Sequence, residues 1–262
     1  MNDTPLVVKI GGAALAEPNT LVRLLEALAV ACNQRPWLLV HGGGAMVDQW
    51  LAQAGYATEK KDGQRITPAE QIPLISGALA GYSNLQFVQL AQHAQLQAVG
   101  LTLADAGGVP LTIAPELGAV ASPNWRGLTQ AQGYKNLLSH LWGAGYTPVV
   151  SSIGAVDHQL VNVNADLAAA ALASLCQAEL LLLSDVPAIL DDQANPIHSL
   201  PLSAADTYLA NDTIQGGMRV KLLAAIEAAR LSRRSTAITS WQHADAVVAL
   251  LNGGTVGTRI TF

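Results

Sequence analysis

Two short apolar runs in this chain end directly in clusters of glycine. Leu6–Ile10 is followed by Gly11-Gly12, and Trp37–Val40 is followed by His41 and the glycines 42–44. A helical pattern begins soon after each cluster. Glycine lets the backbone turn sharply and approach a ligand closely, and a helix N-terminus offers free N–H groups to an anion. A repeated unit of strand, tight turn and helix limits the chain to folds in which helices connect parallel strands.

The same alternation continues along the chain. Further strands are expected at 98–103, 147–153, 179–183 and 236–239, and helices at 17–32, 44–54, 68–79, 84–95, 131–143, 165–176, 203–210 and 217–231. Hairpins are expected at 56–67, with its turn at Lys61-Asp62-Gly63, and at 109–121. Thr67 is expected to cap the helix that starts at Pro68.

These elements predict a three-layer α/β/α sandwich, an α/β fold with an open, mainly parallel sheet and helices on both faces. Ligands of such sheets bind at the carboxyl ends of the central strands, so the cleft is expected there. A lobe boundary is placed near Gln177, which divides the chain into an N-terminal lobe (1–176) and a C-terminal lobe (177–262).

Composition agrees with this sheet and excludes several functions. Half of the 262 residues are apolar and 13 % are charged, which suits strands buried on both faces and leaves room for a subunit interface. The net charge of -5 gives no basic footprint for nucleic acid. The N-terminus lacks a signal-peptide pattern, and the apolar run 167–176 is shorter than the ~20 residues that span a bilayer. Cys32 and Cys176 are expected as buried thiols, so we expect a cytoplasmic protein without membrane contact.

Lys9 is the residue that fits its strand least well. Burying an ammonium group is costly without a partner, but a lysine beside a glycine loop can point at a phosphate. The alternative for Lys9 is an edge lysine whose amine reaches solvent. The alternative for each glycine cluster, taken alone, is a plain tight turn. Neither cluster forms a P-loop or a dinucleotide fingerprint, and His41 stands where a ribose-binding acid would be expected.

Two further segments combine a helix start with unusual polar residues. In Asn162-Val163-Asn164-Ala165-Asp166, capping explains Asn164 and a dipole-compatible acid explains Asp166, but Asn162 has no such reason. In the segment 216–221, two glycines precede a helix with Lys221 in its first turn. A cation there opposes the helix dipole, so it is either solvated or placed for a bound polyphosphate.

Taken together and in order, these motifs resemble the amino acid kinase family. They are Lys-x-Gly-Gly at 9–12, His-Gly-Gly-Gly at 41–44, Asn-Val-Asn-Ala-Asp at 162–166 and Gly-Gly-Met-x-x-Lys at 216–221. The stretch 61–70 is similar to the region that carries the substrate arginine in members acting on N-acetyl-L-glutamate. Ser184-Asp185-Val186 resembles the start of the family's nucleotide loop, although Pro187-Ala188 stand where a glycine is usual. The resemblance covers essentially the whole chain.

The resemblance implies transfer of a phosphoryl group from ATP, with Mg²⁺ held mainly by the phosphates, to the side-chain carboxylate of N-acetyl-L-glutamate, a step of arginine biosynthesis. A carboxylate is already ionised at neutral pH, so the reaction needs positioning and charge neutralisation rather than a general base. By resemblance, the N-terminal lobe binds N-acetylglutamate and the C-terminal lobe binds ATP. The implied residues are Lys9, Lys221 and Asp166 at the phosphoryl group; Gly43, Gly44, Arg65 and Asn162 at the substrate; and Gly11, Gly12, Ser184, Asp185, Val186, Leu190, Gly216, Gly217 and Met218 at the nucleotide.

Other readings remain. The chain could be another member of the family, namely an aspartate, glutamate 5-, carbamate, uridylate or aminoadipate-carrier kinase, or a catalytically silent nucleotide-binding module. Arginine-inhibited members carry an extra helix before the first strand and form hexamers, whereas about five residues precede that strand here. The chain therefore resembles the arginine-insensitive type, for which a homodimer is expected.

Overall fold

The computed structural model describes residues 4–210 and 214–261, and its centre is an eight-stranded sheet. The expectation that no helix precedes the first strand rests partly on residues 1–3, which lie outside the described residues. The strand order is β12-β14-β13-β11-β1-β2-β8-β5, and every neighbouring pair is parallel except β13 with β14. Their bounds are β1 (Leu6–Ile10), β2 (Trp37–His41), β5 (Ala98–Thr102), β8 (Thr147–Ser151), β11 (Glu179–Ser184), β12 (Ser199–Pro201), β13 (Thr236–Ser240) and β14 (Thr258–Thr261).

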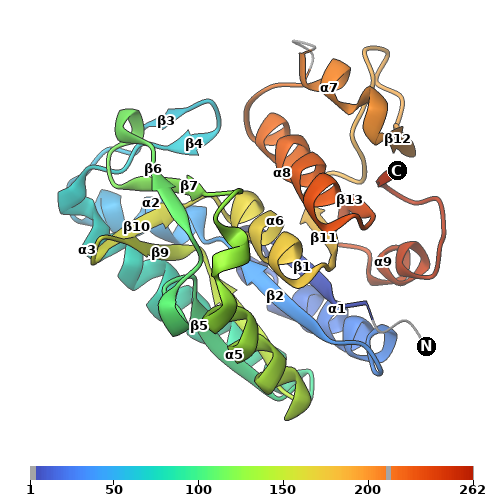
Figure 1. The fold of residues 1–262 in the computed structure, drawn as a ribbon, viewed down its shortest axis with the longest axis horizontal. Helices are drawn as coiled ribbons and strands as arrows, with labels where there is room; N and C mark the ends of the chain where they lie inside the picture. The colour runs from blue at the N-terminus through green and yellow to red at the C-terminus, as the bar shows by residue number, and fades with distance from the viewer. Residues whose placement is uncertain (1–3, 211–213, 262) are drawn as a thin grey trace.

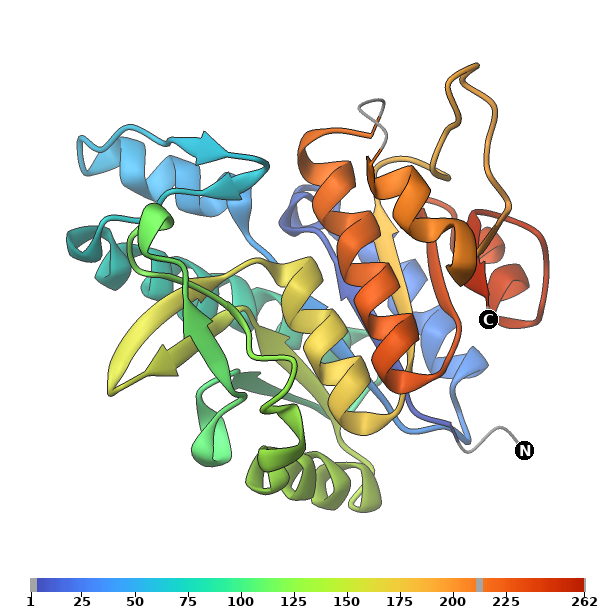
Figure 2. The same ribbon diagram turned by 45° about the horizontal axis from the view of Figure 1, so that its top comes forward.

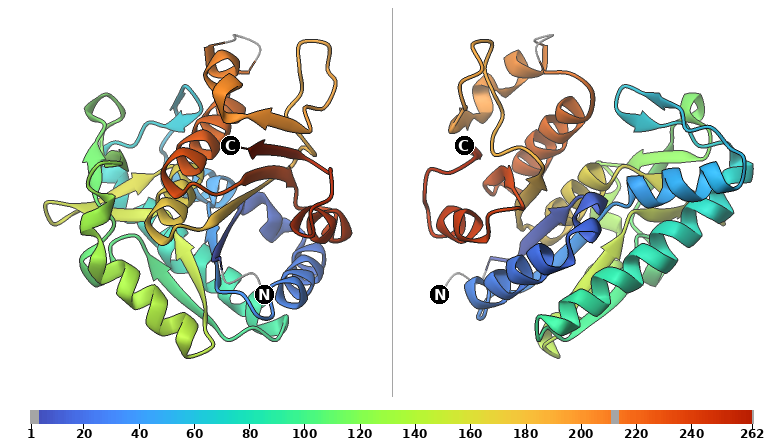
Figure 3. Two further views of the ribbon diagram at one scale, coloured as in Figure 1. Left: turned by 45° about the vertical axis from the view of Figure 1, so that its right-hand side comes forward. Right: turned by 180° about the vertical axis from the view of Figure 1, so that it is seen from behind.

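Helices cover both faces of this sheet, which confirms the predicted α/β fold (Figures 1 and 3). Val7 of β1 packs with α5, α6 and α8 on one face, while its neighbours Leu6 and Val8 pack with α1, α4 and α9 on the other. This alternation along a strand is what a sheet buried on both sides requires. The helices are α1 (Pro18–Ala31), α2 (Gly44–Gln53), α3 (Ile72–Ser76), α4 (Asn84–His93), α5 (Gln132–Gly143), α6 (Ala165–Cys176), α7 (Leu202–Ala210), α8 (Gly216–Ser232) and α9 (Ala244–Leu251).

Two smaller sheets lie beside the carboxyl end of the main sheet. One has the order β6 (Leu111–Ile113), β7 (Val120–Pro123), β10 (Gln159–Val163) and β9 (Ile153–Val156). The other is the predicted hairpin of β3 (Lys60–Lys61) and β4 (Gln64–Arg65), whose turn residues Asp62 and Gly63 both have positive φ angles. The hairpin predicted over 109–121 is also present, as β6 paired antiparallel with β7.

α6 holds the middle of the molecule and is buried along nearly its whole length, from Asp166 to Cys176. Asn164 caps it, as predicted, because its side-chain oxygen accepts hydrogen bonds from the N–H groups of Asp166 and Leu167. The small side chains of its alanines let α8 pack closely against it. Both cysteines of the chain, Cys32 and Cys176, are buried free thiols, as predicted. Within the described ranges, no helix has both the length and the apolar character needed to cross a bilayer.

Several sequence expectations were wrong. Thr67 does not cap a helix, because its backbone bonds to the Leu117–Ala119 segment and the helix begins later, with a 3₁₀ turn at Ala69–Gln71. The two helices expected at 68–79 and 84–95 are joined by a π-helical segment, Gly77–Ser83.

The single strand expected at 147–153 is two strands in different sheets, because the chain leaves the main sheet at Ser152. The C-terminal elements α9, β12 and β14 had not been predicted.

Candidate active site

The two glycine clusters meet at the carboxyl end of the sheet. β1 and β2 are parallel neighbours, so Ile10 lies opposite His41, and the Gly42 N–H donates to the Ile10 carbonyl at 3.3 Å. A Cβ on Gly12 would lie 2.8 Å from the Gly42 carbonyl oxygen, closer than real Cβ contacts come. Glycine is thus required where the loops touch, and both loops border one site.

A carboxylate between two ammonium groups stands beside these loops. One oxygen of Asp166, Oδ1, lies 2.9 Å from Lys9 Nζ and 2.7 Å from Lys221 Nζ. The three residues come from the end of β1, the first turn of α6 and the start of α8, and each is less than a tenth exposed, at 7 %, 7 % and 8 % for Lys9, Asp166 and Lys221. The cluster therefore carries one uncompensated positive charge in a buried place, which suits an anionic ligand.

The pKa shifts follow from this arrangement. Burial disfavours the Asp166 carboxylate, but the charges and hydrogen bonds of Lys9 and Lys221 more than offset it, so the Asp166 pKa lies below its ordinary value. The pKa of Lys221 is also lowered, first by burial and then by the like charge of Lys9. A bound polyanion would relieve the repulsion between the two lysines, and the site thus favours a phosphate.

A pocket of about 200 Å³ opens next to the cluster and is lined by Gly43, Gly44, Arg65 and Asn162, the four residues expected at the substrate. The Arg65 guanidinium is held by an ion pair of 2.5 Å to Asp48 and donates to Thr58 Oγ1 at 3.0 Å. These contacts fix the planar guanidinium at the wall of the pocket, which Arg65 lines. The Asn162 amide donates to Thr67 Oγ1 at 3.3 Å, so its carbonyl oxygen can still accept a hydrogen bond.

The residues expected at the nucleotide lie on two segments of the C-terminal part. Gly216, Gly217 and Met218 form the first turn of α8, one turn before Lys221. Ser184 ends β11, and the following Asp185 accepts a 2.8 Å hydrogen bond from the Trp241 indole. Val186 and Leu190, further along that loop, have 40 % and 46 % of their surfaces exposed. Gly11 has open space where a Cβ would be. Pro187-Ala188 precede Ile189, whose N–H donates a hydrogen bond to Thr258 Oγ1 and so fixes the end of this loop.

The hairpin β3–β4 reaches across to the start of α8, as Figure 2 shows. A Cβ on Gly63 at the hairpin turn would lie 2.8 Å from the carbonyl carbon of Gly216 and 2.9 Å from the nitrogen of Gly217. A segment expected at the acetylglutamate side and one expected at the nucleotide side are therefore in backbone contact.

Sequence reasoning missed the residues that support the second glycine loop. In the sequence, His41 served only to argue against a dinucleotide fingerprint. In the structure, its buried ring forms hydrogen bonds with Gly42 and Asn84. Ser83, just before Asn84, packs against Gly43, and its buried hydroxyl has no hydrogen-bond partner among the described residues. Gly100 is a sequence signal for the position of Asn84, since a glycine inside a strand marks a close approach of another group, here the Asn84 side chain.

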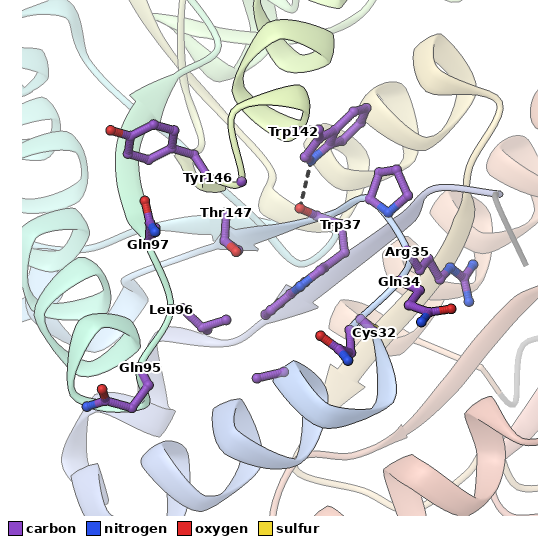
Figure 4. A pocket seen from close by; sticks show the side chains of 14 residues that line it. Cys32, Gln34, Arg35, Trp37, Gln95, Leu96, Gln97, Trp142, Tyr146 and Thr147 are labelled. Carbon is purple, nitrogen blue, oxygen red and sulfur yellow. Dashed lines mark hydrogen bonds between the residues drawn. The ribbon is translucent and has the colours of Figure 1, made fainter. Parts of the chain in front are cut away.

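A larger hollow, of about 520 Å³, lies at the opposite end of the sheet (Figure 4). Its walls are amides and aromatic rings, and Trp142 donates from its indole to the Trp37 carbonyl at 2.8 Å. Arg35, at its rim, is already paired with Glu179 at 2.5 Å. This hollow lies far from the lysine cluster along the strands, so the smaller pocket at the glycine loops is the candidate site.

Comparison with known proteins shows which family the chain belongs to. The model of the amino acid kinase family matches residues 4–240. The chain is 45 % identical over 260 residues to the acetylglutamate kinase of Serratia proteamaculans, covering 98 % of each, and 46 % identical over 258 residues to that of Colwellia psychrerythraea, covering 98 % of this chain and 96 % of the other. The fold matches Giardia carbamate kinase with a TM-score of 0.74 at 16 % identity, covering 100 % of this chain and 99 % of that one. The chain therefore belongs to the amino acid kinase family.

Proposed function

We propose that this chain transfers the γ-phosphoryl group of ATP to the side-chain carboxylate of N-acetyl-L-glutamate, giving ADP and N-acetylglutamyl 5-phosphate, the second step of arginine biosynthesis. The observation that carries the proposal is the Lys9–Asp166–Lys221 cluster beside a pocket that holds an oriented arginine. The identity of 45–46 % to two acetylglutamate kinases over almost the whole chain supports the same substrate.

The residues divide the chemistry as follows. A carboxylate oxygen of the substrate attacks the γ-phosphorus in line, the bond to the β,γ-bridging oxygen breaks, and ADP leaves with the electron pair. Lys9 and Lys221 neutralise charge on the transferring phosphoryl oxygens, and Asp166 bridges the two ammonium groups and orients them. Arg65 binds the substrate's other carboxylate and Asn162 its acetamido group. No group has to remove a proton, since the nucleophile is already ionised.

ATP enters as its Mg²⁺ complex, so the metal belongs to the substrate. Among the described residues, no three acidic, histidine or cysteine side chains gather in a way that could hold a metal ion. Asp166, the carboxylate of the cluster, is occupied by two lysines. In this proposal the phosphates of ATP are the ligands that carry the metal into the site.

The finer assignments rest on where the residues lie. Residues 1–176 supply the acetylglutamate pocket and 177–262 the nucleotide side, supported by the pocket's lining from residues 42–165.

A homodimer is proposed through β5, the edge strand of the main sheet, and the neighbouring α4, whose Leu85 is 64 % exposed. Changing Leu85 to Glu should shift the sedimentation of a dimer toward that of a monomer. A cytoplasmic setting is supported by the two free thiols.

A coupled assay of ADP release tests the function directly. The purified chain, given MgATP, should turn over N-acetyl-L-glutamate and leave N-acetyl-L-aspartate, glutamate and carbamate nearly untouched. Hydroxylamine should trap the acyl phosphate as a hydroxamate. Preference for carbamate or free glutamate would move the chain to another member of the family, and ATP binding without turnover of any of the four would favour a silent module.

A further inference from the structure

The His41 ring lies under the second glycine loop with both nitrogens engaged. The residue is fully buried, and its ring stacks on Phe87 with centroids 4.6 Å apart. Its Nδ1 lies 3.1 Å from the Gly42 carbonyl oxygen, and its Nε2 lies 3.0 Å from the side-chain nitrogen of Asn84. Burial lowers the pKa of His41 to about 4, so the ring is neutral at physiological pH.

Asn84 determines which ring nitrogen carries the proton. The amide nitrogen of Asn84 also donates to the Val149 carbonyl oxygen at 2.9 Å. A carbonyl can only accept, so the NH₂ end of the amide must face this way, and its second N–H must be donated to His41 Nε2. Nε2 is therefore an acceptor, and the proton sits on Nδ1, where it is donated to the Gly42 carbonyl.

This bond sets the direction of the next peptide group. In a trans peptide the C=O and the N–H point in opposite directions, and the chain has no cis peptide bond within its described residues. Because the Gly42 carbonyl faces the His41 ring, the Gly43 N–H faces away from it. Gly43 lines the candidate pocket, and its N–H has no acceptor among the described residues.

Gly100 makes room for this arrangement from the far side. It lies inside β5, and a Cβ there would collide with the side-chain oxygen of Asn84, as well as approach its Cγ to 3.3 Å. A strand glycine with an ordinary negative φ angle needs such a steric reason. Gly100, Asn84 and His41 thus form a chain of contacts from the sheet edge to the glycine loop.

We propose that His41 and Asn84 are positioning residues, which fix the Gly42–Gly43 peptide so that the Gly43 N–H donates to the reacting carboxylate of the substrate. This inference rests on the proposed function. It assigns the two side chains a role in acetylglutamate binding and none toward ATP, since neither contacts the lysine cluster or α8 in the described structure.

Three variants and one control test it. His41→Leu removes the donor, and the KM for N-acetylglutamate should rise roughly tenfold or more while that for ATP changes less than about twofold. His41→Asn places an amide N–H near the position of Nδ1 and should recover part of the loss. Gly100→Ala, which touches neither loop nor pocket, should act in the same direction by displacing Asn84. Gly143→Ala is the matched control, because a Cβ there meets nothing within 4 Å.

The ¹⁵N spectrum of the ring supplies a readout that packing alone would not move. In the wild-type protein at neutral pH, His41 should show the Nδ1–H tautomer, and Gly100→Ala should shift the mixture toward Nε2–H. An Nε2–H ring in the wild type, or equal losses of acetylglutamate and ATP affinity in the variants, would overturn the inference. Failure of the wild type to phosphorylate N-acetylglutamate would instead refute the proposed function, and the spectrum would still decide the tautomer.

Discussion

The ammonium group of Lys221 donates a 2.7 Å hydrogen bond to Asp166, a residue of a different helix and 55 positions earlier in the chain. Lys9 reaches the same carboxylate oxygen at 2.9 Å, so two cations share one anion in a buried place. The pKa of Lys221 is lowered by burial and by the charge of Lys9, which means that the fold holds the charged form of this lysine at a cost. A phosphoryl group between the lysines would remove that cost, which ties the electrostatics of the resting site to its function.

Replacing Lys221 with Met should therefore separate activity from stability. Turnover should fall by about 10² or more, because a charge aimed at the transferring phosphoryl group is lost. The free energy of unfolding should change little, since Asp166 keeps Lys9 as its partner and one repulsion disappears. Steady-state kinetics and thermal unfolding measure the two effects. Arg230→Met, on the same helix but on the surface, is the control and should keep full activity.

Arg65 should be selective for one substrate. Arg65→Lys keeps a positive charge but loses the planar fork that now spans Asp48, Thr58 and the pocket. We expect the KM for N-acetylglutamate to rise by at least about tenfold and the KM for ATP to stay within about twofold. Lys61→Arg, on the exposed neighbouring strand, should change neither value. An equal rise in both constants would place Arg65 on the nucleotide side and contradict the substrate assignment.

The parts of the fold that sequence predicted well are those governed by local rules. Asn164 was predicted as a cap because its side chain needs only the next few N–H groups, and that bond is present. The run 147–153 was predicted as one strand because it is apolar throughout, but only tertiary structure decides that the chain changes sheets at Ser152. The gap predicted between the helices at 68–79 and 84–95 is instead a π-helical segment, Gly77–Ser83, which contacts α2 and keeps the backbone helical.

The candidate site shows the same division. The family motifs predicted which lysines, glycines and acid belong together, and the structure places Lys9, Asp166 and Lys221 in contact. Asn84 carries no motif, and its bond to His41 spans 43 residues, so no local pattern indicates it. A positioning contact of this kind depends on a space left by Gly100 in another strand, which only the folded arrangement reveals.

Stability should decrease as the pH is lowered through a window that the pKa of His41 defines. Its pKa is about 4 in the folded protein and ordinarily 6.5, so below pH 6.5 the unfolded chain binds a proton that the folded one refuses. The free energy of unfolding should therefore decrease by about 3 kcal/mol between pH 6.5 and 4. The lowered pKa of Asp166 adds a loss only at lower pH, below its ordinary value of 3.8. Denaturant titrations across this range check the slope, and His41→Asn should flatten it.

The contact between Gly63 and Gly216 predicts a variant that impairs both substrates at once. Gly63→Ala meets two obstacles: a φ angle of +79° and a Cβ position 2.8 Å from the Gly216 carbonyl carbon. The hairpin must then withdraw from α8, so both KM values should rise severalfold and turnover should drop. Gly55→Ala is the matched control, because its φ angle is +82° and a Cβ there meets nothing within 4 Å. Both variants should lose about 1–2 kcal/mol of stability from the left-handed backbone, and only Gly63→Ala should lose activity. Equal kinetics in the two would mean that the hairpin contact has no part in the reaction.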